Sequence, residues 1–283
     1  MIKINKYIVV LGMIVISGVL PFTGISLAQS VSDIEHIKNF YIRYMEAMEE
    51  SNTEMIDTLE LHFLTPEMRA KKGRLVDATG GNPLLRAQDV SDFGRQSLQC
   101  SYLEDDWYMV SYRWNEKDSV GIHIPLRIVQ DAQGQSRIGY VTPESAREGY
   151  GNQHFDIPEV VIEDDKDACT FVETFFKAYV YPYVRMLPTL DQDLMRLRQT
   201  YFTPDMQKEY ATMLQMFLED ANPIDPMIGC ADFDAFWYSS IKVTPIEGNL
   251  FKIEYNTGDS IICVKLIVMR QNGKYRILEL NLN

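Results

Sequence analysis

The chain has 283 residues, of which 46% are hydrophobic and 24% charged, and its formal net charge is −13. The composition is typical of a globular protein, and the length favours about two domains. So acidic a body lacks the basic surface by which proteins bind nucleic acid or anionic lipid, and we expect neither as a partner.

The first 28 residues have the features of a signal peptide. Lys3 and Lys6 form a basic start, an apolar run extends from Tyr7 to Leu20, and Ser26-Leu27-Ala28 is a small-x-small cleavage site. The run is shorter than the roughly 20 residues of a membrane span. We therefore predict cleavage, no membrane insertion of the mature chain, and export to the periplasm or the medium. The alternative is a segment retained as an N-terminal anchor.

Sequence motifs for metals and cofactors are absent. The four cysteines, Cys100, Cys169, Cys230 and Cys263, show no CxxC or CxxH spacing and lie in apolar surroundings. Free buried thiols are expected, with one bridge in the second half as the alternative. The chain has no Gly-rich phosphate loop, no GxSxG and no HExxH. We expect no metal and no cofactor.

One sequence pattern occurs twice. Thr65-Pro66-Glu67-Met68 returns as Thr203-Pro204-Asp205-Met206, and Phe40 to Tyr44 returns as Phe175 to Tyr179. An offset of about 140 residues indicates a duplicated domain, because solenoid repeats are about 20 to 50 residues long.

A longer cassette follows each Thr-Pro motif. The second copy reads Asn222-Pro223-Ile224-Asp225-Pro226 and then Ala231-Asp232-Phe233. The first copy matches it at Asn82-Pro83 and at Ala87-Gln88-Asp89. In this alignment Leu85-Arg86 replaces Asp225-Pro226, and Val90 replaces Phe233. In this alignment the first copy is the diverged one.

Helices are predicted at the start of each copy. A capping box at Ser32 and Glu35 opens the first, and Thr65-Pro66 is a good N-cap and first turn. The predicted helices cover residues 32–50, 53–61, 65–79, 167–181, 190–199 and 203–219.

Short aromatic and β-branched runs then predict strands joined by tight turns, and hence antiparallel neighbours. Asn272-Gly273 is a strong hairpin turn. Residues 157–162 are expected to dock as an extra edge strand. The predicted strands cover residues 96–102, 107–114, 121–129, 137–141, 236–244, 250–255, 260–270 and 274–280.

Helices followed by an antiparallel meander predict an α+β fold. We expect a signal peptide at 1–28, a first repeat at 29–145, a linker at 146–166 and a second repeat at 167–283. The order of elements resembles the cone-shaped nuclear-transport-factor-2-like fold. The cassette, with Asp225-Pro226 and Ala231-Asp232-Phe233, is similar to a family of uncharacterised exported bacterial proteins assigned to that fold. The resemblance covers the mature chain twice and implies two tandem cones, but no catalytic residues.

The repeated acids Asp89 and Asp232 are candidate ligand-binding residues at the mouths of the cones. The alternative, which we favour, is that both bind backbone N–H groups in a turn, as Asp225 before Pro226 would also do. Aromatic residues of the second copy are core lining or a stacking platform for a ligand. The candidate set is Asp89, Asp232, Asp225, Trp237, Tyr201 and His123.

The wider nuclear-transport-factor-2-like superfamily includes ketosteroid isomerase and scytalone dehydratase, which use an acid or a His–Asp pair in an apolar cavity. Of the four histidines, only His123 lies on a central predicted strand. A lone strand histidine is more often a hydrogen-bonded structural residue, because a catalytic one needs a charged partner.

The most consistent function is an exported, non-catalytic protein that binds a small apolar or amphipathic ligand or another envelope protein. One alternative is a cofactor-independent isomerase, dehydratase or hydrolase that uses a cavity acid. The other is an inhibitor or immunity protein whose acidic surface faces a basic toxin.

Overall fold

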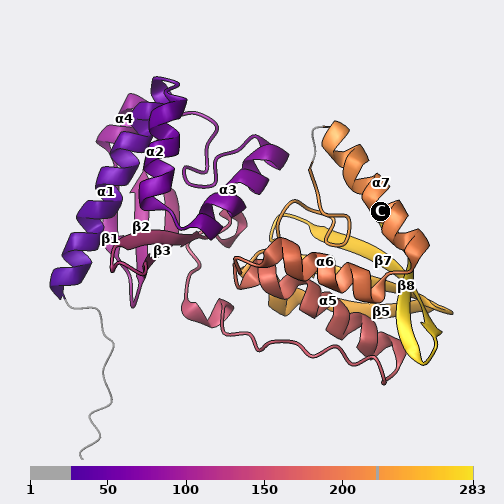
Figure 1. The fold of residues 1–283 in the computed structure, drawn as a ribbon. Coiled ribbons are helices and arrows are strands. Elements are labelled where there is room, and N and C mark those ends of the chain that lie inside the picture. The colour runs from indigo at the N-terminus through magenta and orange to yellow at the C-terminus, as the bar shows by residue number, and fades with distance from the viewer. Residues whose placement is uncertain (1–26, 221–222, 283) are drawn as a thin grey trace, which may run out of the picture.

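The computed structural model describes residues 27–220 and 223–282. It contains two four-stranded antiparallel sheets, β1-β2-β3-β4 and β5-β6-β7-β8, each in chain order. Figure 1 shows the two sheets in separate halves of the molecule, each with its own helices. The α+β class and the helices-then-meander order of each half are thus as predicted from the sequence.

Within residues 27–141 the first half has four helices and four strands. Helix α3 begins at the predicted cap, where the Thr65 hydroxyl accepts a hydrogen bond from the Met68 N–H at 3.2 Å, and it ends at Gly80 with a φ of 66°. The elements are α1 (Leu27–Glu49), α2 (Thr53–Phe63), α3 (Pro66–Thr79), α4 (Asp92–Gln96), β1 (Gln99–Tyr102), β2 (Trp107–Tyr112), β3 (Ile122–Gln130) and β4 (Ser136–Val141).

The second half repeats the scheme after two short 3-10 turns. Thr203 caps its third helix as Thr65 does, again with a bond of 3.2 Å. The predicted hairpin turn at Asn272-Gly273 is present, with both residues at positive φ. The elements are η1 (Glu144–Ala146), η2 (Asn152–His154), α5 (Ala168–Val184), α6 (Leu190–Tyr201), α7 (Pro204–Glu219), η3 (Ala235–Ser240), β5 (Lys242–Glu247), β6 (Leu250–Asn256), β7 (Ile261–Gln271) and β8 (Lys274–Leu282).

Each half has its own hydrophobic core of large aromatic side chains. In the first half Phe40, Tyr41 and Tyr44 of α1 are fully buried together with Tyr108 of β2. In the second half the counterparts, all fully buried, are Phe171, Phe175, Phe176, Tyr179 and Phe233. These rings fill the space between the first helix and the sheet, where a cone would otherwise be open.

Four sequence-based expectations about local structure are wrong. Ser32 lies inside α1 rather than at its cap, and no strand forms between Ile157 and Ile162. Gln96 ends helix α4, and Phe236 lies in η3, although both were assigned to strands. The cause of the last two is a capping residue: Ser91 accepts from the Gly94 N–H at 2.9 Å, and Asp234 from the Phe236 N–H at 3.1 Å.

The register of the cassette also differs from the expected alignment. The Asn82 N–H donates to the Ala87 carbonyl, and the Asp225 N–H donates to the Cys230 carbonyl, so Asn82 corresponds to Asp225 and not to Asn222. A core tyrosine under each loop supports the same register. The Tyr112 hydroxyl donates to the Leu85 carbonyl and the Tyr255 hydroxyl to the Ile228 carbonyl, both at 2.5 Å, so Leu85 corresponds to Ile228. Arg86 then corresponds to Gly229, with φ of 50° and 64°.

The four cysteines are free, as expected, but all four are half-buried rather than fully buried. Cys230 hydrogen-bonds the Tyr255 hydroxyl at 2.9 Å, and burial raises the pKa of its thiol to about 12, so the thiolate nucleophile is suppressed.

The predicted signal peptide lies outside the described residues except for its last two positions. Across the described part of the chain, no helix is long and apolar enough to cross a membrane.

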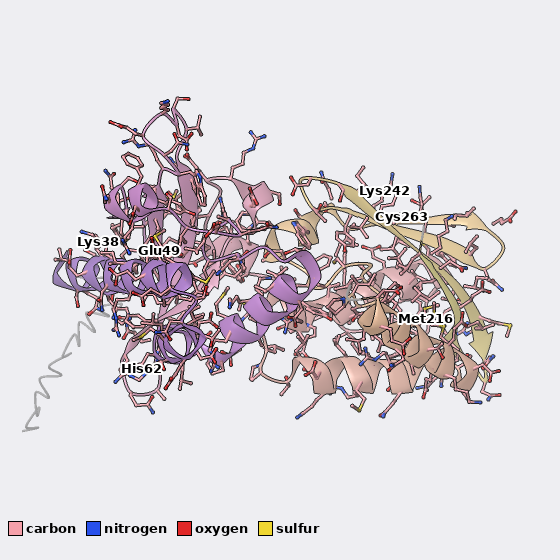
Figure 2. All side chains as sticks on the ribbon, turned by 90° about the horizontal axis from the view of Figure 1, so that it is seen from above. Lys38, Glu49, His62, Met216, Lys242 and Cys263 are labelled. Atoms are coloured by element: carbon pink, nitrogen blue, oxygen red, sulfur yellow. The ribbon has the colours of Figure 1, made fainter. Side chains whose placement is uncertain are left out.

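The two halves meet along helix α3 and the segment after β4. Figure 1 shows α3 on the side of the first half that faces the second. Phe155 of the connecting segment packs on Tyr140 of β4, with ring centroids 4.8 Å apart, and His154 stacks on Phe236 at 3.8 Å. Figure 2, seen from above, shows Lys38, Glu49 and His62 in the first half and Met216, Lys242 and Cys263 in the second, well away from this contact.

Candidate ligand-binding cleft between the halves

A cavity of about 440 Å³ lies where the two halves meet. Helix α3 and the 81–88 loop supply one wall, the segment after β4 a second, and the cassette and η3 of the second half a third. Its apolar lining includes Met68, Leu75, Pro83, Val141 and Trp237.

A buried ion network forms the inner wall of this cleft. The Lys71 ammonium lies 3.1 Å from a carboxylate oxygen of Asp232 and 3.1 Å from one of Asp234. Arg74, one helical turn further along α3, contacts the other Asp232 oxygen at 2.6 Å. The side chains of Lys71 and the two aspartates are at most 4% exposed, so three charges from two halves are removed from water together.

The network holds its protons firmly. Burial alone would lower the pKa of Lys71, but Asp232 and Asp234 outweigh burial and raise this pKa above its ordinary value. Burial, reinforced by Asp234, raises the pKa of Tyr140 far above normal, and the Tyr140 hydroxyl donates to Asp234 at 2.6 Å. Neither Lys71 nor Tyr140 is therefore a proton acceptor at neutral pH. The two cations of this wall, Lys71 and Arg74, are paired with two carboxylates, those of Asp232 and Asp234.

Arg86 occupies the rim of the cleft in a left-handed conformation. Its guanidinium donates to the carbonyls of Thr142, Pro143 and Arg147 at 3.0 to 3.2 Å, and also to the His123 carbonyl and the Thr142 hydroxyl. It thereby ties the end of β4 to the 81–88 loop. Burial lowers the pKa of Arg86, although the nearby Glu144 opposes this effect. The Nε–H of Arg86 is buried without a hydrogen-bond partner.

Trp237 enters the cleft from η3. Its ring stacks on Tyr255, with centroids 6.0 Å apart and planes 23° apart, and contacts Phe233 edge-on at 5.7 Å. The indole Nε1–H is buried and has no hydrogen-bond partner. The core aromatics therefore fix the orientation of the ring but leave its donor unused.

A second, more polar hollow of about 670 Å³ adjoins the cleft and shares Arg86, Glu144 and Asp259 with it. His123 lies in this hollow, where its Nδ1 is 2.6 Å from a carboxylate oxygen of Glu148. The histidine side chain is 39% exposed, so it faces away from the core of its sheet. Its charged partner is therefore a surface carboxylate rather than an acid buried in the core of a cone.

Three of the six predicted site residues thus lie at or beside the cleft: Asp232, Trp237 and His123. The preferred turn interpretation is wrong for Asp232, whose carboxylate binds Lys71 and Arg74. Its first-half counterpart Asp89 is exposed and accepts from the Val90 N–H at 2.8 Å, as the turn interpretation predicts.

The other two predicted residues belong to the core of the second half. Asp225 is buried and accepts hydrogen bonds from the hydroxyls of Tyr179 and Tyr183, both at 2.9 Å, and from that of Tyr210. It also accepts from a backbone N–H two residues on, which is the expected turn contact. Tyr201 packs its ring against Phe171 at 5.7 Å. Neither residue lines the cleft.

Four residues of the cleft were not predicted from the sequence: Lys71, Arg74, Arg86 and Tyr140. One signal was available for Lys71: Met68, Lys71 and Leu75 recur at helical spacing, which places a lysine on the buried face of α3. Such a lysine needs an anionic partner, and the partner lies 161 residues further along the chain. Within the described residues no group of three His, Cys, Asp or Glu side chains is arranged to hold a metal ion.

No protein-family model matches this sequence, and no curated protein does. A solved structure of a protein of unknown function from Bacteroides thetaiotaomicron is 30% identical over 40% of this chain and 91% of its own, with a TM-score of 0.37. A type VI effector-immunity complex from Ralstonia pickettii is 16% identical over 41% of this chain and 91% of that one, with a TM-score of 0.25. An Ntf2 like protein involved in plasmid conjugation is 11% identical over 89% and 96% of the two chains, with a TM-score of 0.22.

Proposed function

We propose that this chain, which belongs to one family with the Bacteroides thetaiotaomicron protein of unknown function, is a binding protein that takes a small amphipathic molecule between its two halves. The cavity of about 440 Å³ at their contact carries the proposal. Small-molecule sites are typically clefts of roughly 300–1,000 Å³ that favour domain contacts, with apolar linings and a few fixed polar groups.

The filled cores support this location for the ligand. Aromatic side chains such as Tyr41, Tyr108, Phe176 and Phe233 are fully buried and occupy the space inside each half. A ligand inside a cone, as the resemblance to the nuclear-transport-factor-2-like fold implied, would have to displace them. The cleft offers room without any such displacement.

The balanced ion network favours binding over catalysis. A general acid or base needs a pKa near the working pH, whereas Lys71 and Tyr140 both have raised pKa values and are already hydrogen-bonded to carboxylates. The network fixes the walls in advance, which reduces the free energy lost in ordering them when a ligand binds.

The localisation of the protein is a second part of the proposal and rests on the sequence alone. Lys3, Lys6, the apolar run and Ser26-Leu27-Ala28 predict export with cleavage after residue 28. The expected N-terminus of the protein purified from its host is Gln29. N-terminal sequencing that instead returned Met1 would favour the retained anchor.

Native mass spectrometry of the protein recovered from its host tests the binding function. We expect a small-mass adduct that is lost on denaturation. Leu75→Trp, which enlarges a side chain lining the cleft, should abolish the adduct, whereas Asp77→Trp, an exposed position on the same helix, should retain it. An adduct equally present in both variants, or a bare mass in the unaltered protein, would contradict the proposal. A protein-bound mass would favour the inhibitor or immunity alternative.

A further inference from the structure

A groove of about 230 Å³ lies between helices α6 and α7 of the second half. Its lining residues are Met195, Arg198, Gln199, Phe202, Gln207, Tyr210, Ala211 and Leu214. We propose that this α6–α7 groove binds the α7 helix of a second copy of this chain in antiparallel orientation, so that two molecules form a symmetric dimer. None of the residues that line the ligand cleft comes from α6 or α7, so the dimer and the ligand are independent proposals.

Helix α7 carries two rows of side chains at alternating intervals of four and three residues, the spacing at which helices pack on a neighbour. One row faces the core of the second half, where Met206 and Tyr210 are buried. The other row faces the groove and consists of Gln207, Ala211, Leu214 and Leu218, of which the first three line it. All members of this second row except Leu214 are exposed. The spacing thus provides a seam for another helix.

The C-terminal end of α7 extends beyond the core of its half. That core reaches Met213 and Leu214, whereas Met216 and Leu218 are 57% and 63% exposed. Figure 1 shows this end of α7 standing clear of the second sheet. Large apolar side chains gathered at an exposed helix end favour a contact with another protein surface.

Helix α3, the counterpart of α7 in the first half, lacks this exposed apolar end. It packs against the second half through the ion network of the cleft. When the Thr65 cap is matched to the Thr203 cap, α3 ends at Gly80, and α7 has Leu218 at the matching position. The additional apolar length of α7 is therefore specific to the copy whose third helix does not lie between the halves.

The charges of the groove and of the α7 end are complementary. Arg198 is the one charged residue in the lining of the groove. The end of α7 carries Glu219 and Asp220 beside the negative end of the helix dipole, with no basic residue in its last turn. An antiparallel pair sets this acidic end beside the first turns of the other α7, where the groove holds Arg198.

Arg198 has donors available for such a partner. Only its Nη1 donates to described residues, to the hydroxyls of Tyr179 at 3.0 Å and Tyr210 at 3.4 Å. Its Nε and Nη2 make no hydrogen bond with them and are not among the buried atoms without a partner, so both retain accessible surface. Two neighbouring guanidinium donors match the two oxygens of a carboxylate.

The net charge of −13 opposes the association of two copies. Salt screens exposed charges that lie more than about 10 Å apart, so the groups at the contact decide the outcome under physiological conditions. At the contact itself the apolar seam and the Arg198 guanidinium both favour a second α7.

A head-to-tail chain of molecules is disfavoured by charge. In such a chain α7 of one molecule would pack on the first half of the next, as α3 packs on the second half. Glu209 of α7 stands where α3 has Lys71, and the acid that it would face is Asp89. Two like charges in place of an ion pair weaken this contact, which leaves the closed two-fold pair.

Sedimentation velocity of the protein purified from its host, between about 1 and 100 µM, tests the dimer, because an interface of this size is expected to be weak. The dimer fraction should rise with concentration. Leu218→Glu should weaken association at least about tenfold, since it places a charge on the apolar seam. The matched control is Leu61→Glu on α2, where the leucine is 59% exposed against 63% for Leu218, and it should leave association unchanged.

A second pair of variants tests the antiparallel orientation. Glu219→Lys should weaken association about threefold or more, because it sets a cation near Arg198 of the other copy. Glu209→Lys makes the same change of net charge away from the groove-facing row. It should not weaken association, since it reduces the repulsion between two acidic molecules.

Four results would overturn the inference. The first is a monomer throughout the concentration range, and the second is an equal loss of association in Leu218→Glu and Leu61→Glu. The third is a Glu219→Lys protein that associates as well as Glu209→Lys, which would exclude the contact with Arg198. The fourth is a series of species larger than a dimer, which would indicate an open assembly. None of these results bears on the ligand cleft.

Discussion

Asn82 and Asp225 occupy the same position in two copies of one loop. Each N–H donates to the carbonyl five residues later, and each side-chain oxygen accepts from the N–H two residues later, at 3.0 Å for Leu84 and 2.8 Å for Met227. The surroundings differ. Asn82 also donates to the Tyr44 hydroxyl at 3.0 Å, whereas the carboxylate of Asp225 only accepts.

Replacing Asp225 with asparagine should therefore destabilise the second half. Three tyrosine hydroxyls donate to this carboxylate, and the amide would remove the charge and offer an N–H₂ group to donors. We expect a loss of about 2 kcal/mol in the free energy of unfolding, as for hydrogen bonds to a charged group. Urea denaturation measures it. The control is Asp89→Asn at an exposed position, which should change the free energy of unfolding by less than about 0.5 kcal/mol. Equal effects of the two substitutions would refute the argument.

Removing the Lys71 ammonium should cost much more than removing a surface lysine. Lys71→Met leaves Asp232 with Arg74 alone and Asp234 without a cation, and breaking a buried pair in this way costs about 3 kcal/mol or more. Lys208→Met removes an exposed pair with Asp205 at 3.8 Å and should cost less than about 0.5 kcal/mol. Thermal unfolding of both variants compares them. A Lys71→Met protein as stable as the original would mean that the network contributes nothing to the contact.

Alkaline pH should unfold the protein from about pH 10 upward. The pKa of Lys71 is raised in the folded state, so its contribution is complete below the unfolded pKa and is lost as the pH rises through the folded one. Burial raises the pKa values of Tyr140, Tyr179, Tyr183 and Tyr210, so above the unfolded pKa of about 10 the unfolded chain loses protons that the folded chain retains. Each such tyrosine lowers stability by about 1.4 kcal/mol per pH unit. The tyrosinate absorbance contributed by these four buried side chains should accordingly appear together with the loss of circular dichroism, and its appearance while the circular dichroism persists would contradict this.

Gly258 should be far less replaceable than Gly248. Both have positive φ, 93° and 53°, but a Cβ on Gly258 would lie 2.5 Å from the Cβ of Ser145, whereas one on Gly248 would meet nothing within 4 Å. Alanine at either position introduces backbone strain, and at 258 it must also push the β6–β7 hairpin away from the segment after β4. We expect Gly258→Ala to cost at least about 1 kcal/mol more than Gly248→Ala in the same denaturation assay. Equal losses would show that the hairpin does not rest on Ser145.

Much of the fold was predictable because its signals are local. Thr65-Pro66 and Thr203-Pro204 set two helix starts, and Asn272-Gly273 sets a hairpin, each through residues adjacent in the chain. The errors at Gln96 and Phe236 came from weighing aromatic content above the capping residues Ser91 and Asp234. The domain boundaries and the signal peptide stay predictions.

The cleft was predictable only in part because its parts are remote in sequence. The repeated motif marks Asp232 as a candidate, and the aromatic residues after it mark Trp237. The sequence does not indicate which residues either side chain contacts. The partner of Asp232 is Lys71, which a helical pattern marks as buried without naming its partner. The role of Arg86 depends on a left-handed φ at a position where the second copy has Gly229, and this match appears only with the corrected register.

The divergence at the Asn82 and Asp225 loops has a consequence for how a tandem repeat folds. In the first half the carboxylate that meets the core tyrosine comes from α2, where Glu60 accepts from Tyr44 at 2.8 Å; at the corresponding place on α6, Arg198 donates to Tyr179 at 3.0 Å. A chain that paired α2 with the wrong sheet would bring Glu60 against Asp225, so that two carboxylates would share one buried site. Duplicated domains are prone to exchange elements during folding. This reciprocal change of polar groups penalises such crossed intermediates, so each copy accepts its own helices and rejects those of its neighbour.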